Sequence, residues 1–108
     1  MSATTAILEP VLVQQFDDAC MKAVRIGQRL GYDPSIYLGM RAEYGPVEAA
    51  IRLVDGMMHY GIDKLWQLAR LDLTLEAIIH DNPQFHVLFP QMTVANADVL
   101  LHKVGYIP

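Results

Sequence analysis

The sequence predicts an all-α fold, a compact orthogonal bundle of five to six short helices. Apolar residues recur at helical spacing along most of the chain, and glycine and proline divide it into short segments. We find no alternating apolar run bounded by hairpin turns, which a strand would show. With 108 residues, the chain is expected to form one domain, a single helical domain over residues 10–108 behind a flexible N-terminal arm over residues 1–9.

The first helix is expected over residues 11–30. Pro10 suits a helix start because its φ is fixed and it lacks a donor, and Gly31 suits a helix end. The intervening apolar positions follow gaps of three and four, and they are Leu12, Phe16, Ala19, Ala23, Ile26 and Leu30.

Two more helices follow at proline starts. Asp33-Pro34 predicts a helix over residues 34–43 that buries Ile36, Tyr37 and Met40. Gly45-Pro46 and Gly56 frame a third helix over residues 46–55, with Val47, Ala50, Ile51 and Val54 facing inward.

The second half of the chain is predicted as three helices and one irregular turn. A short helix over residues 62–69 carries Leu65, Trp66 and Leu68 into the core, and Asp72 caps a helix over residues 73–81. Asn82-Pro83 ends that helix, and residues 84–89 form a turn that buries its apolar side chains. A last helix over residues 91–103 turns Val99 and Leu100 or Leu101 inward.

Composition narrows the function more than any motif. The chain is 53% hydrophobic with mean hydropathy +0.22, so a partner could cover apolar surface. No run approaches the roughly 18 to 20 apolar residues of a membrane helix, and the N-terminus lacks a secretory pattern. A single cysteine, Cys20, excludes an intrachain disulfide and favours the cytoplasm.

Nucleic-acid binding has one candidate surface. Lys22, Arg25 and Arg29 mark one helix face, and Arg41 could join them. The net charge of −4 opposes this reading, because non-specific affinity comes from neutralised phosphates. A solvated face with ordinary ion pairs is the favoured interpretation.

Metal or enzyme chemistry has weak support. Glu76 and His80 are four residues apart, a spacing that can share a metal, and His86 follows. No motif completes a metal site, no phosphate loop or nucleophile signature occurs, and Cys20 lacks a neighbouring base. We therefore predict no catalytic residue, no metal and no cofactor.

Protein contact is the preferred function. Met57, Met58, His59 and Tyr60 form a soft amphipathic segment that could bind a partner or fill the core. Arg70, in the block LWQLARLDLTLE, either pins a corner of the fold or meets a partner. Both readings stay open here, together with self-association as a homodimer.

Several segments together resemble a group of small uncharacterised bacterial helical domains. The similar pieces are GYDPSIYLGM (31–40), YGPVEAAIRLV (44–54), RLDLTLEAII (70–79), Leu88-Phe89 and Gly105-Tyr106. The chain departs from the group at Ala69, where glycine is usual, and at PQMT (90–93). The resemblance implies an all-helical fold and an accessory or interaction role.

Overall fold

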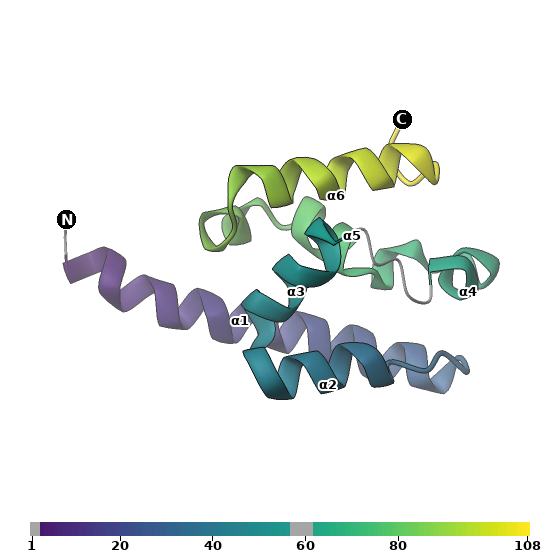
Figure 1. Ribbon diagram of the computed structural model, residues 1–108, viewed down its shortest axis with the longest axis horizontal. Coiled ribbons are helices and arrows are strands. Elements are labelled where there is room, and N and C mark those ends of the chain that lie inside the picture. Colours follow the sequence, from purple (N-terminus) through teal and green to yellow (C-terminus); the bar gives the residue numbers. More distant parts are fainter. Residues whose placement is uncertain (1–2, 57–61) are drawn as a thin grey trace.

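A computed structural model describes residues 3–56 and 62–108 as an all-helical bundle (Figure 1). The described part contains six α-helices and two 3-10 helices: α1 (Ala3–Arg29), α2 (Ser35–Tyr44), α3 (Pro46–Asp55), α4 (Ile62–Gln67), η1 (Leu71–Leu73), α5 (Leu75–Asp81), η2 (Pro83–Leu88) and α6 (Gln91–Lys103). Helices α3 and α5 lie between α6 on one side and α1 on the other (Figure 1). The predicted all-α class is confirmed.

Helix α1 is much longer than predicted. It begins at Ala3 rather than at residue 11, so residues 3–9, predicted as part of a flexible arm, are helical. Pro10 therefore lies inside the helix, where it removes one backbone hydrogen bond. The N-terminal part of α1 extends past the other helices (Figure 1).

Helices α2 and α3 follow the predicted glycine and proline signals. Gly45 has φ +85°, a left-handed conformation that favours glycine, and it separates the two helices. The bounds of α3 match the prediction, and Ala50 and Val54 are buried. Asp33 does not occupy the N-cap of α2, but its carboxylate accepts a hydrogen bond from the Ser35 N–H at 3.0 Å.

The predicted helix over residues 73–81 is divided into η1 and α5. Thr74, rather than Asp72, is the N-cap of α5, and its Oγ1 accepts a hydrogen bond from the Ala77 N–H at 3.1 Å. The same hydroxyl donates to the Leu71 carbonyl at 2.8 Å. Thr74 thus ends one helix and begins the next, which a carboxylate at residue 72 cannot do.

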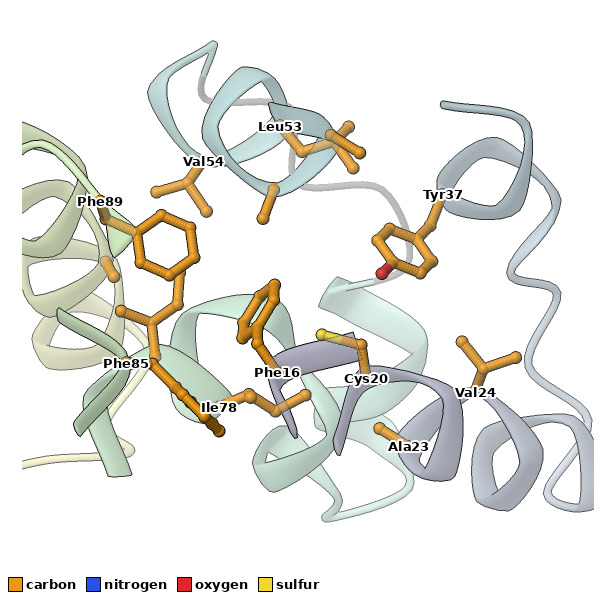
Figure 2. Close-up of a cluster of buried hydrophobic side chains, with 14 residues drawn as sticks. Phe16, Cys20, Ala23, Val24, Tyr37, Leu53, Val54, Ile78, Phe85 and Phe89 are labelled. Atoms are coloured by element: carbon orange, nitrogen blue, oxygen red, sulfur yellow. The ribbon is translucent and has the colours of Figure 1, made fainter. Parts of the chain in front are cut away.

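The centre of the core is an aromatic cluster around Phe16 of α1. The Phe16 ring meets Phe85 and Phe89 edge to face, with centroids 5.5 and 5.1 Å away (Figure 2). All three rings are buried, and removing one such ring typically costs about 3–5 kcal/mol. The predicted irregular turn is therefore the 3-10 helix η2, which carries Phe85 against α1.

A polar link joins α3 to α6. Asp55, the last residue of α3, accepts hydrogen bonds from the Thr93 hydroxyl at 3.0 Å and the Asn96 amide at 3.1 Å. Thr93 is fully buried, so its hydroxyl depends on this partner. The link fixes the start of α6 against the end of α3.

Three predicted core residues are exposed instead. The exposed fraction is 47% for Ile36, 61% for Trp66 and 57% for Val99. Their neighbours Tyr37, Leu65 and Leu100 are buried. These three neighbours were also predicted inside, so one residue of each pair is confirmed. Adjacent residues of a helix are rotated by about 100°, so a narrow buried face takes only one of the two.

Candidate functional site

The first candidate site is a shallow groove between α4 and the end of α6. Ile62, Asp63 and Trp66 contribute from α4, and Lys103 and Val104 contribute from the C-terminal side. We call these five residues the Trp66 groove. Tryptophan is enriched among the residues that contribute most to binding at the centre of protein interfaces.

The end of α4 explains why Trp66 faces outward. Leu65 is buried and anchors this six-residue helix, so the next side chain is rotated away from the core. The helix closes with two backbone hydrogen bonds, from Arg70 N to Leu65 O at 2.8 Å and from Ala69 N to Trp66 O at 3.0 Å. This is a Schellman ending with its left-handed residue at Ala69, φ 56°.

The groove carries charges of both signs. Asp63 and Lys103 lie on its two sides, and both are exposed. The apolar surface of Trp66 is therefore bordered by Asp63, Lys103 and the neighbouring His102, which resembles the polar rim of a protein interface.

The second candidate site is a cavity of about 90 Å³ between α1, α2, α4 and α5. Its walls are mainly aliphatic, and they include Ala23, Val24, Leu53, Leu65 and Ile78. Its polar groups come from distant parts of the chain: Cys20, Tyr32, Asp33, Tyr37, Thr74 and Glu76.

Tyr37 is the most distinctive group of the cavity. Its side chain is nine-tenths buried, and its hydroxyl has no hydrogen-bond partner in the described part of the chain. Figure 2 shows this hydroxyl pointing toward the Cys20 sulfur, and a thiol is only a weak partner. A buried hydroxyl without a partner costs about 1–3 kcal/mol.

Burial controls the titration of the cavity groups. It raises the pKa of the Cys20 thiol to about 12, and it also raises the pKa of the Tyr37 hydroxyl. The pKa of Tyr32 is raised by its partial burial and then by the negative charges of Asp33 and Glu76. The cavity is therefore a neutral, thiol-containing space with a negative border.

One of the four basic residues predicted to bind nucleic acid is engaged in an ion pair in the structure. Lys22, Arg25 and Arg29 are exposed on α1. Arg41 instead forms a two-point ion pair with Asp17, which ties α2 to α1. Its guanidinium is therefore occupied within the fold, and the candidate nucleic-acid surface is reduced to three residues of one helix.

Arg70 is occupied close to its own position. Its guanidinium donates to both carboxylate oxygens of Asp72, at 2.9 and 3.0 Å. It does not pin the corner to a distant helix. The other predicted partner-binding residues, Met57, Met58, His59 and Tyr60, lie outside the described residues.

The possible metal ligands do not converge. His80 Nδ1 lies 2.9 Å from an Asp98 oxygen, and His86 Nε2 lies 2.9 Å from the Ile79 carbonyl, whereas Glu76 lines the cavity. Within residues 3–56 and 62–108, no group of three or more His, Cys, Asp or Glu side chains could hold a metal ion.

Sequence reasoning missed both candidate sites. Trp66 was predicted inside, and Tyr37 was predicted to be buried without a cavity beside it. The signal present in the sequence was the pair of tyrosines at 32 and 37 flanking a proline. The six-residue length of α4, which leaves room for one inward face, is known only from the structure, since the sequence predicts a helix over residues 62–69.

Comparison with known proteins adds no assignment. No family model matches the chain, and neither a curated protein nor a solved structure matches it. Among the described residues, no helix has the length and apolar character needed to cross a membrane. The resemblance to small bacterial helical domains stays a prediction.

Proposed function

We propose that this protein is a non-enzymatic interaction module that self-associates through the Trp66 groove. The observation that carries the proposal is the 61% exposure of the Trp66 side chain. A buried tryptophan removes about 150–250 Å² from water, so covering this side chain gives a partner a strong apolar anchor. Ile62 and Val104 beside it extend the apolar contact.

Charge complementarity favours a second copy of the chain as the partner. In a two-fold symmetric dimer, a residue on one copy meets its complement on the other, and the reverse contact is made at the same time. Asp63 of one protomer then faces Lys103 of its partner, twice per interface, around the two tryptophans. A different protein would have to present one base opposite Asp63 and one acid opposite Lys103, whereas a second copy of this chain already carries both.

The chain provides its own reporter for this proposal, because Trp66 is its only tryptophan. We expect light scattering to show a dimer at micromolar concentration, and we expect tryptophan emission to shift to the red on dilution. Trp66→Ala abolishes the dimer, whereas Val87→Ala, which removes a 76% exposed apolar residue of η2, leaves it intact.

Charge-reversal variants distinguish specific self-association through the Trp66 groove from non-specific apolar association. Asp63→Lys and Lys103→Asp each weaken the dimer, and the double variant restores it, because the pair is re-formed with opposite signs. The proposal is contradicted if the protein is a monomer throughout the micromolar range and if its tryptophan emission does not change on dilution. Single and double charge variants that behave alike assign the contact to another surface.

A further inference from the structure

We infer that the cavity between α1, α2, α4 and α5 is a binding site for a small uncharged molecule with a short apolar body and one hydrogen-bonding oxygen, such as an alcohol. This inference is independent of the Trp66 groove, because Ile62 is the one described residue that lines both the cavity and the groove. It rests on one polar group, on the walls around it and on the charge at its border.

The polar group is the Tyr37 hydroxyl. Buried hydroxyls in folded proteins are satisfied by protein or by ordered water, whereas this one lines the cavity and, in the described part of the chain, faces only the weakly bonding Cys20 thiol. A ligand oxygen placed beside it accepts the O–H and completes its hydrogen bonding. Thr74 does not compete, because its hydroxyl is occupied by Leu71 and Ala77.

The walls set the size and polarity of the ligand. Val24, Leu65 and Ile78 line the cavity and are buried, so the body of the ligand must be apolar. An apolar cavity of about 150 Å³ accepts benzene. At about 90 Å³, this cavity suits a chain of roughly four carbons by that comparison.

The charge at the border of the cavity determines which ligand charge the site accepts. The exposed side chain of Asp33 lies at the border of the cavity, and hydrogen bonds from Ser35 lower the pKa of its carboxyl. A carboxylate repels an anion, and an ammonium group must lose its water to reach the buried hydroxyl. A neutral oxygen avoids both penalties.

The test compares three molecules that share a four-carbon chain: 1-butanol, butylammonium and butyrate. Methyl NMR shifts of Val24, Leu65 and Ile78 report binding in the cavity. Val87 and Val99, exposed on η2 and α6, serve as internal controls. We expect saturable shifts with butanol at the cavity methyls alone, weaker binding of butylammonium, and about tenfold weaker binding of butyrate.

Tyr37→Phe distinguishes a ligand-binding hydroxyl from a structural one. We expect it to weaken butanol binding about threefold to tenfold and to raise the melting temperature of the free protein, because an unpartnered buried hydroxyl is removed. If the Cys20 thiol were its working partner, the same change would lower the melting temperature. Tyr44→Phe, on the exposed side of α2, changes neither quantity.

A second variant tests the cavity independently, in case Tyr37→Phe does not fold. Ala23→Leu fills the cavity from α1, and we expect it to abolish the saturable shifts while the control methyls keep their native positions. Trp66→Ala leaves butanol binding unchanged, which separates this site from the dimer surface. Three results would overturn the inference. The first is that none of the three molecules gives saturable shifts, as expected for a cavity that holds only water. The others are that butylammonium binds more tightly than butanol, or that Tyr37→Phe leaves the butanol affinity unchanged.

Discussion

Arg41 holds Asp17 at two points, with Nε 2.7 Å from Oδ1 and Nη2 2.7 Å from Oδ2. The carboxylate is mostly buried, with its side chain 14% exposed, and the guanidinium side chain is 33% exposed. The pair joins α1 to α2 across 24 residues of sequence, beside the cavity groups Cys20 and Tyr37.

We expect Arg41→Met to lower the free energy of unfolding by about 1–3 kcal/mol, because the Asp17 carboxylate loses its partner while mostly buried. The free energy of unfolding of Arg41→Lys should lie between those of the wild type and Arg41→Met, because an ammonium group makes one contact where the guanidinium makes two. Urea titration measures the difference. Arg52→Met is the matched control, because its pair with Glu48 is exposed within one helix and should cost no more than about 1 kcal/mol. Equal losses in the two methionine variants would contradict this account.

Ala69→Gly should stabilise the protein by about 0.5–1 kcal/mol. Ala69 has φ 56°, the left-handed conformation that glycine adopts without steric cost. Thermal unfolding with van't Hoff analysis measures the change. Ala42→Gly is the control, since Ala42 lies inside α2 and the same substitution there should destabilise by about 1 kcal/mol. A lower stability for Ala69→Gly would show that the strain is absent.

The Cys20 thiol should resist alkylation in the folded protein. Burial raises its pKa to about 12, so almost no thiolate, the reactive form, exists at pH 8. We expect iodoacetamide to label the native protein slowly and the urea-unfolded protein rapidly, as followed by mass spectrometry. Because the folded pKa lies above the unfolded one, the stability from the neutral thiol is complete below about pH 8.5 and is lost as the pH rises toward 12. Rapid labelling of the native protein would contradict its burial.

Asp72 should titrate below its usual range. Hydrogen bonds from Arg70 lower its pKa in the folded protein. A lowered folded pKa means that the stabilisation is present above the unfolded pKa, about 3.9, and is lost as the pH falls through the folded value. Since the Asp72 side chain is 46% exposed, the contribution should be only about 0.2–1 kcal/mol.

Arg70→Gln tests this relationship. We expect NMR titration to show the pKa of Asp72 returning toward its ordinary value. We also expect the small stability difference from the wild type at pH 7 to disappear as the pH falls through the folded pKa of Asp72. Arg25→Gln, on another helix, leaves the Asp72 titration unchanged. A difference that persists in strong acid would assign the effect of Arg70 to packing.

Local signals in the sequence account for much of the fold. Gly45-Pro46 and Gly56 define α3 because glycine and proline act through their own backbone preferences, which need no tertiary contact. Pro10 misled the prediction, because a proline inside a helix removes one hydrogen bond without stopping the residues before it. Thr74 and Asp72 are both acceptable N-caps, and only the position of η1 selects the threonine.

The candidate sites were harder to predict because they depend on contacts between distant segments. Hydrophobicity alone places Trp66 in the core, but a helix of six residues anchored by Leu65 cannot bury both. The cavity brings together Cys20, Tyr37 and Glu76 from three helices, and no spacing between these residues records that they meet. Packing gaps of this kind arise from side-chain shape, which helical periodicity does not describe.

The edge-to-face contacts of Phe16 with Phe85 and Phe89 also constrain how the chain acquires its structure during synthesis. Phe16 belongs to the first fifth of the chain, whereas its two aromatic neighbours belong to the last quarter. A nascent chain therefore carries Phe16 without its two aromatic neighbours until residues 85–89 have been synthesised. Such non-local contacts slow folding relative to bundles stabilised by neighbouring helices, and they leave an aggregation-prone face exposed during translation.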